Sequence, residues 1–187
     1  MPEIIEFNTD RLRLRQWRVA DRESFASLNA DPKVMEFFPT PLDRAASDVM
    51  ADHCQTLIAE RGWGFWAVEL RNTNEFIGFV GLHIPSAELP FSPCIEVGWR
   101  LAFQSWGKGF ATEAARGALR VGFELLGLPE VVSFSAVRNT RSRAVMARLG
   151  MCQAATTFEH PSVPAGSELR QHCLYRLSRE YWRAHAA

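Results

Sequence analysis

A strand-like run, a glycine-containing loop and a long amphipathic stretch follow one another in the middle of this 187-residue chain. Residues 94–101 are mostly apolar and have the length of a strand. Gly107 and Gly109 follow, one residue apart, and apolar residues then recur at helical spacing over residues 109–126. Residues 131–137 make a second short apolar run. We expect the two strands to be parallel and joined in the right-handed sense, which predicts an α/β fold.

The rest of the chain predicts hairpins around this parallel unit. The further helices are expected over residues 19–30, 41–61 and 139–149, and the further strands over residues 11–15, 63–70, 75–84, 151–158 and 172–177. Thr40 is the expected cap of the second of these helices, with Pro41 at its first position and Gly62 as its stop. Because 187 residues fit one domain, we expect a single domain over residues 1–187, with a mixed sheet and a core over about residues 9–179.

Composition and charge argue against several classes of protein. Lys+Arg and Asp+Glu number 21 each, so the chain has no net charge that would favour binding to nucleic acid or to an anionic membrane surface. The N-terminus lacks a signal-peptide pattern and no apolar run approaches the ~20 residues of a membrane span, which predicts a cytoplasmic protein. The cysteines are Cys54, Cys94, Cys152 and Cys173. Their wide spacing disfavours a zinc site or a redox pair, so we expect no bound metal.

The glycine loop is predicted to bind an anion. Two glycines let the backbone approach a ligand closely, and the helix that follows adds unpaired N–H groups and the positive end of its dipole. A Walker loop is not present, because Ala102 and Gly109 stand where that motif has its first glycine and its Ser or Thr. A dinucleotide fingerprint is weak, because Thr112 replaces its third glycine, although Glu130 stands near the position of its acid.

Basic residues gather around this loop in an otherwise neutral chain, and no acid occurs between Glu130 and Glu159. Four arginines fall in that stretch and three basic residues precede it: Arg138, Arg141, Arg143 and Arg148, and Lys108, Arg116 and Arg120. A local basic patch beside a glycine loop favours a ligand with several phosphates, such as coenzyme A. Arginines on a solvated helix face would give the same pattern.

Several motifs in register resemble those of one protein family. They are Gln104-x-x-Gly107-x-Gly109 after a strand, Asn139-x-x-Ser142, Leu149-Gly150-Met151, and the runs over residues 9–15 and 96–101. The chain resembles the GNAT acetyltransferase superfamily from about residue 9 to its last strand. The last two runs point to its RimJ/RimL-like branch, which includes ribosomal-protein N-terminal acetyltransferases. This resemblance implies a GNAT-like fold of about six or seven mostly antiparallel strands with a splayed parallel pair and about four helices.

The resemblance also implies acetyl-CoA as acetyl donor and direct transfer to an amine. In such proteins the strand that matches residues 96–101 splays from the one that matches residues 131–137, and the pantetheine arm enters between them. The residues expected to hold the donor are Trp99 and Leu101 at the arm and the acetyl oxygen, Gln104, Trp106, Gly107, Lys108, Gly109, Phe110, Ala111 and Thr112 at the pyrophosphate, Asn139 at the arm and Arg148 at an outer phosphate.

Direct transfer needs a neutral amine and a proton for the departing thiolate. Glu96 is the candidate general base, acting directly or through water, and a structural ion pair with Arg100 or another neighbour is the alternative. Ser142 is the candidate acid, and a helix-start hydroxyl bonded to local backbone is the alternative. Met146 stands where many members of the superfamily carry a tyrosine acid, so a tyrosine cannot give the proton here.

Residues outside these motifs are candidates for the acceptor side. Glu159, His160 and His172 flank the last loop, where a histidine would act as a base or form ordinary strand-end hydrogen bonds. Six aromatic side chains would line the acceptor cleft or, in most cases, belong to the core: Trp17, Phe37, Phe38, Trp63, Phe65 and Trp66.

We therefore expect an acetyl-CoA-dependent N-acetyltransferase whose acceptor is a protein N-terminus or a small-molecule amine. Acid clusters that would hold a polycation are not obvious in the sequence, which disfavours a polyamine. A CoA-binding sensor without catalysis and a nucleotide-binding module are the alternative classes of protein. The chain is expected to act as a monomer or a homodimer.

Overall fold

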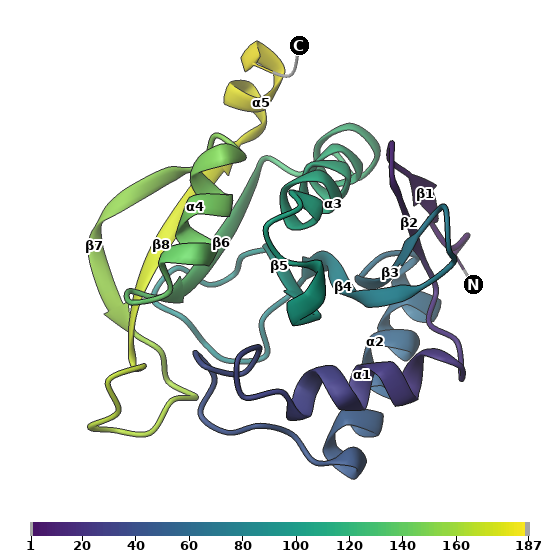
Figure 1. Cartoon of the computed structure of the whole chain (residues 1–187). Coiled ribbons are helices and arrows are strands. Elements are labelled where there is room, and N and C mark those ends of the chain that lie inside the picture. The colour runs from purple at the N-terminus through teal and green to yellow at the C-terminus, as the bar shows by residue number, and fades with distance from the viewer. Residues whose placement is uncertain (1, 186–187) are drawn as a thin grey trace.

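The computed structural model describes residues 2–185, in which one eight-stranded sheet carries five α-helices (Figure 1). The strands are β1 (Phe7–Asn8), β2 (Leu12–Arg15), β3 (Phe65–Leu70), β4 (Phe76–His83), β5 (Glu96–Leu101), β6 (Glu130–Ala136), β7 (Cys152–Glu159) and β8 (Gln171–Ser178). The helices are α1 (Asp21–Ala30), α2 (Arg44–Arg61), α3 (Phe110–Arg120), α4 (Thr140–Arg148) and α5 (Arg179–His185). A 3₁₀ turn, η1 (Phe103–Ser105), precedes α3, and a π-helical turn, η2 (Val121–Leu125), extends it.

The sheet is mixed and has the strand order β1-β2-β3-β4-β5-β6-β8-β7. Neighbouring strands are antiparallel except β5 and β6, which are parallel and joined by the crossover through α3. The mixed sheet with its one parallel pair, within the described residues, confirms the predicted fold class. The sequence pattern did not predict the two-residue strand β1 or the helix α5.

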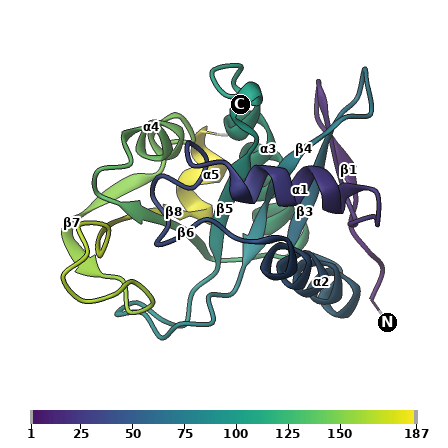
Figure 2. The ribbon, with the colours of Figure 1, turned by 60° about the horizontal axis from the view of Figure 1, so that its bottom comes forward.

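Helices cover the two faces of the central strands separately (Figure 2). Side chains alternate between faces along a strand, so Phe79 and Leu82 of β4 point to opposite faces. Phe79 packs on Phe25 of α1, with ring centroids 6.0 Å apart. Leu82 lies on the side of the crossover, where one of its methyl carbons is 3.2 Å from the position that a Cβ would take at Gly122. The helix α1, with α2 beside it, therefore covers one face, and α3 with its π-helical extension covers the other.

The helix α2 begins later than predicted. Its N-cap is Asp43, whose carboxylate accepts a hydrogen bond of 2.8 Å from Ala46 N. The prediction that Thr40 caps this helix was therefore wrong. The segment before Asp43 is not helical and is attached to α1, because Leu42 N donates to Asn29 C=O near the end of that helix over 3.0 Å.

Substitution of Asp43 by alanine is expected to lower the free energy of unfolding by about 1 kcal/mol, because it removes the N-cap of α2. Thr40→Ala is the control, since Thr40 is exposed and lies before the helix, and it should change the free energy by less than about 0.5 kcal/mol. Chemical denaturation measures both variants. Equal losses would contradict the assignment of Asp43 as the cap.

The four cysteines are free thiols. Within residues 2–185, no group of three His, Cys, Asp or Glu side chains is placed to hold a metal ion. No helix in the same part of the chain is long and apolar enough to cross a membrane.

Candidate active site

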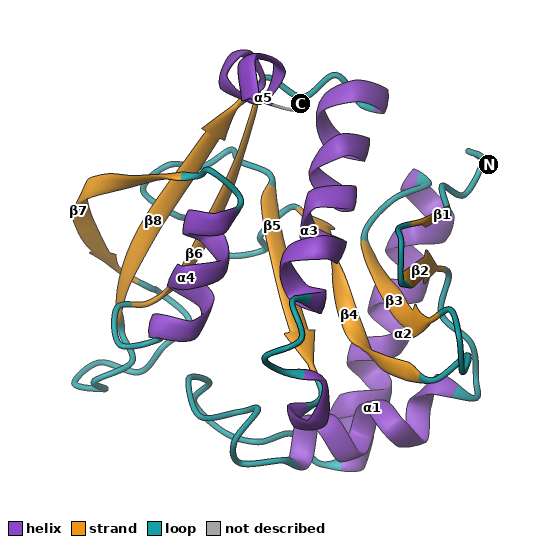
Figure 3. Cartoon of the chain, turned by 45° about the horizontal axis from the view of Figure 1, so that its top comes forward, coloured by secondary structure: helices purple, strands orange, loops and turns teal. Residues whose placement is uncertain are grey.

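The parallel strands β5 and β6 separate soon after they meet (Figure 3). In the described residues, Glu96 and Val132 are their one register pair, and Val132 N donates to Ile95 C=O over 2.9 Å. Beyond this point β6 continues to pair with β8, and β5 with β4. The edge of β5 after Glu96 therefore faces an opening in the sheet. This geometry agrees with the splayed pair that the resemblance implied.

Two backbone positions of β5 face this opening. Backbone groups alternate in direction along a strand, and Ile95 C=O points toward β6. Trp99 and Leu101 are four and six residues further on, so their N–H and C=O groups point the same way. Leu101 C=O already accepts a hydrogen bond of 2.8 Å from Nε1 of Trp106. The backbone of Trp99 is therefore placed to bind an extended arm that carries amide groups.

The glycine loop leads directly into α3. Gly107 has φ +74° and Gly109 has φ +81°, a left-handed conformation that favours glycine. Gly109 is the N-cap of α3, and no side chain of the described residues caps this helix. The first N–H groups of α3 and the positive end of its dipole are therefore available to an anion.

Residues that precede β2 hold this loop in position. Arg11 donates from Nη1 to Lys108 C=O over 3.0 Å and from Nε to Glu113 Oε2 over 2.7 Å. Thr9 donates from Oγ1 to Glu113 Oε1 over 2.6 Å. The sequence predicted a strand over residues 11–15 and marked residues 9–15 as a family motif, but it gave no signal that these residues buttress the start of α3.

A cleft of about 1880 Å³ extends from the glycine loop through the opening to Glu96 and the hairpin of β7 and β8. It is lined by most of the residues predicted for the site: Glu96, Trp99, Leu101, Trp106, Gly107, Gly109, Phe110, Ala111, Thr112, Asn139, Ser142 and Arg148. Gln104 and Lys108 are exposed and do not line it. The structure therefore brings the candidate base and the glycine loop to one continuous site.

Two segments far apart in the sequence complete the walls of the cleft. Residues 33–39 contribute Phe37 and Phe38, whereas the other predicted aromatic residues do not line it: Trp17, Trp63, Phe65 and Trp66. The loop between β7 and β8 brings His160 next to His172, with ring centroids 4.9 Å apart. Burial lowers the pKa of His172 to about 4 and also lowers that of His160, so both rings are neutral at pH 7.

Part of the predicted basic patch lines the cleft: Arg116, Arg120, Arg141 and Arg148. Arg138 and Arg143 do not, because Arg138 pairs with Glu168 and Arg143 donates to Val137 C=O over 3.1 Å. Arg141 lines the cleft but is exposed and pairs with Glu36, so the solvated-face alternative describes these three residues, and the anion-binding interpretation fits Arg116, Arg120 and Arg148.

Glu96 is a carboxyl group on the wall of the cleft that no cation neutralises. It is partly open to the cleft and forms no ion pair within residues 2–185. Burial raises the pKa of Glu96 to about 8, because protein surrounds the carboxyl on most sides and disfavours its charged form. Arg100 donates to Asn29 Oδ1 instead, over 2.7 Å, so the expected alternative of a Glu96–Arg100 ion pair was wrong. A carboxyl group with this pKa is able to accept a proton near neutral pH.

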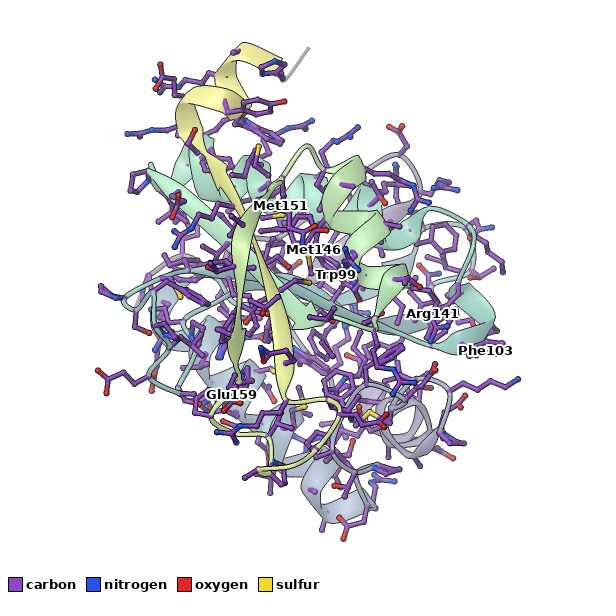
Figure 4. The ribbon with its side chains drawn as sticks, turned by 90° about the vertical axis from the view of Figure 1, so that its left-hand side faces the viewer. Trp99, Phe103, Arg141, Met146, Met151 and Glu159 are labelled. Carbon is purple, nitrogen blue, oxygen red and sulfur yellow. The ribbon has the colours of Figure 1, made fainter. Side chains whose placement is uncertain are left out.

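Asn139 and Ser142 form the start of α4. Asn139 Oδ1 accepts a hydrogen bond of 3.1 Å from Ser142 N, and its Nδ2 donates to the Oγ atoms of Ser135 and Ser142. The Ser142 hydroxyl is the acceptor in that bond and keeps its own proton to donate. Met146, one turn further along α4, is buried and lines the cleft, as Trp99 does (Figure 4). Its thioether has no proton to give.

Comparison with known proteins decides the family. The Acetyltransferase (GNAT) domain family matches residues 11–152, which contain the separated strand pair, the glycine loop and α4. The chain belongs to the GNAT acetyltransferase family. This GNAT acetyltransferase is 32% identical over 184 residues to the FsC-acetyl coenzyme A-N(2)-transacetylase of Aspergillus fumigatus, and the match covers 94% of the chain and 77% of that protein.

Solved structures share the same GNAT fold. The acetyltransferase from Agrobacterium tumefaciens str. C58 is 29% identical, with a TM-score of 0.74 over 95% of this chain and 96% of that one. The ribosomal-protein-S5-alanine acetyltransferase from Vibrio fischeri is 18% identical, with a TM-score of 0.72 over 95% of this chain and 98% of that one. The second likeness shows the fold alone, and the RimJ/RimL-like branch stays a prediction.

Proposed function

We propose that this GNAT acetyltransferase transfers the acetyl group of acetyl-CoA directly to a primary amine. The observation that carries the proposal is the continuity of the cleft, which joins the uncapped start of α3 to the Glu96 carboxyl through the opening between β5 and β6. A phosphate-bearing donor and an amine acceptor would meet in this one site. The proposal takes residues 1–187 as a single catalytic domain of a cytoplasmic enzyme.

The donor end of the cleft offers the groups that CoA requires. N–H groups from Trp106 to Thr112 suit the pyrophosphate, and the backbone of Trp99 suits the amides of the pantetheine arm. Arg148 is exposed at the end of α4 and suits an outer phosphate, while Asn139 lies where the arm would pass. The name of the Aspergillus fumigatus relative includes acetyl coenzyme A, which supports the same donor here.

Groups of this chain account for the proton transfers. The nitrogen of a primary ammonium must lose one proton before it bonds to the acetyl carbon and a second as that bond forms. The Glu96 carboxylate accepts one of these protons directly or through water, and the other replaces the proton that is given to the departing sulfur. Trp99 N–H donates to the carbonyl oxygen, where negative charge develops. Acetyl-CoA supplies the thioester, whose C–S bond breaks as the N–C bond forms. Ser142 Oγ, or water in its place, gives a proton to the departing sulfur.

A protein N-terminus and a small-molecule amine both fit this chemistry. The motifs over residues 9–15 and 96–101 favour a protein N-terminus, as in the RimJ/RimL-like branch. The name of the Aspergillus fumigatus relative places its transfer at an N(2) nitrogen. An α-amine has a pKa near 8 and is about 10% neutral at pH 7, so it needs less help from Glu96 than a lysine amine does.

Amine-dependent release of CoA tests the proposal. The protein is incubated with acetyl-CoA that carries a labelled acetyl group, together with a panel of N-terminal peptides and small amines. We expect CoA release that depends on the amine, with the label on the amine and none on the protein. Tight CoA binding without turnover on any amine would indicate a CoA-binding sensor. Label that accumulates on the protein without an acceptor would contradict direct transfer.

A further inference from the structure

Arg100 is the most buried arginine on the wall of the cleft. It lies on β5 four residues after Glu96, on the same face of the sheet, and is 9% exposed. Phe79 of β4 stands directly opposite Arg100 in the sheet register. Asn29 of α1 and Met50 of α2 contact its guanidinium. Arg100 therefore faces the side of the sheet that α1 and α2 cover.

The guanidinium of Arg100 lacks the partners that a buried arginine needs. Nη1 donates to Asn29 Oδ1, but Nε has no hydrogen-bond partner and no carboxylate pairs with the group within residues 2–185. Burial lowers the pKa of Arg100 to about 10, so the group stays charged at pH 7. Arg15, the other buried arginine of the described residues, pairs with both Asp21 and Glu69, at 2.7 and 2.8 Å. A buried charge without a counter-ion is costly, and a bound anion would offset that cost.

Two aromatic rings enclose the guanidinium of Arg100. The ring centroids of Phe38 and Phe79 lie 4.1 and 5.5 Å from its Cζ. Phe38 belongs to the loop of residues 33–39 and is 37% exposed, so its ring is able to move without disturbing the core. Phe38 and Arg100 both line the cleft, so a shift of this ring would give a ligand in the cleft access to the guanidinium. A planar guanidinium edge matches a carboxylate, which accepts two parallel hydrogen bonds.

We propose that Arg100 binds a carboxylate of the acceptor, so that the enzyme prefers amines that also carry a negative charge. The inference rests on the proposed N-acetyltransferase function and names its acceptor class. Arg100 belongs to the acceptor side because it shares its face with Glu96, whereas Arg116 and Arg120 lie on α3, across the sheet. Four strand residues separate the Cα atoms of Glu96 and Arg100 by about 13 Å. The amine and the carboxylate are therefore expected at different ends of the acceptor.

Matched acceptors test this assignment. The panel is a series of ω-amino acids from glycine to 6-aminohexanoate, each beside its own carboxamide. We expect the wild-type kcat/KM to favour the best carboxylate over its carboxamide by about tenfold or more. Arg100→Met should reduce this ratio to about one through KM, and Arg100→Lys should leave an intermediate ratio. Arg141→Met removes an exposed cleft arginine and should keep the wild-type ratio.

A binding measurement separates this inference from the proposed catalysis. The N-acetylated amino acids and their carboxamides are titrated into the CoA-loaded protein, where no turnover is needed. Tighter binding of the carboxylates in wild type, lost in Arg100→Met, would support the anion site even if no amine were acetylated, and the catalytic proposal alone would then fail. Carboxylates that react and bind no better than carboxamides in wild type would overturn the assignment of Arg100. Binding of neither series would overturn it as well.

Discussion

Replacement of Gly109 by valine is expected to weaken acetyl-CoA binding by about 100-fold or more. Gly109 has φ +81°, so a valine there must accept a left-handed conformation that costs about 1–2 kcal/mol, or rotate the loop. Rotation would turn the first N–H groups of α3 away from the pyrophosphate. The loss of two charge-assisted hydrogen bonds, about 1.5–3 kcal/mol each, accounts for the factor. Isothermal titration calorimetry with acetyl-CoA measures it.

Gly127→Val is the matched control for backbone strain. Gly127 has φ +65° and stands at the far end of the same helical crossover. At both positions the nearest atom to an added Cβ is an arginine Nη at 3.5 Å, from Arg11 at Gly109 and from Arg179 at Gly127. The two variants should melt at similar temperatures, and only Gly109→Val should lose affinity. Unchanged affinity for acetyl-CoA in Gly109→Val would show that this loop does not bind the pyrophosphate.

Substitution of Glu96 by glutamine is expected to lower kcat/KM by about 10²–10⁴-fold above pH 8, because glutamine keeps the shape of the side chain but cannot accept a proton. The pKa of Glu96 is raised to about 8, so the wild-type rate should rise with pH through about 8 and then level off. The variant should show no such rise. The assay uses an acceptor amine whose own pKa lies well below 6, so that the amine is neutral throughout and Glu96 acts only on the proton that the nitrogen loses as the N–C bond forms.

The same carboxyl group predicts an opposite trend in stability. Its pKa is about 8 in the folded protein against an ordinary value of 4.5, so the folded state favours the protonated form. The stabilisation from that form is complete below about pH 4.5 and is lost as the pH rises through 8. Between pH 5 and 8, wild type should therefore lose more free energy of unfolding than Glu96→Gln. Identical pH dependence of rate and stability in both proteins would show that Glu96 is not the titrating group.

Elements with a strong local pattern could be predicted from the sequence, and elements that depend on a neighbour could not. The alternation over residues 11–15 predicted a strand, which the structure shows as β2. The helix expected over residues 139–149 agrees with α4 to within one residue at each end. β1 has only two residues and exists through its pairing with β2, which leaves no periodic signal. Thr40 and Asp43 are both residue types that favour an N-cap, so the local sequence did not decide between them, and the contact of Leu42 N with Asn29 C=O of α1, just before the Asp43 cap, has no local signal.

The candidate site likewise has parts that could be predicted from the sequence and parts that could not. The glycine loop was predictable, because the left-handed conformation of Gly109 and the start of α3 are local properties. The partners of the charged residues were not. Because Glu96 and Arg100 lie on the same face of one strand, the sequence made an ion pair between them a candidate. In the structure Arg100 donates instead to Asn29, which comes from α1. Only the folded structure shows that Arg138 pairs with Glu168 and does not line the cleft.

A crystal structure of the protein with CoA bound tests the central claim most directly. We predict pyrophosphate oxygens within about 3 Å of backbone N–H groups between Trp106 and Thr112. We also predict the thiol sulfur in the opening between β5 and β6, beside Trp99 and on the path to Glu96. Pyrophosphate bound away from the glycine loop, or a sulfur that does not enter the opening, would contradict the account.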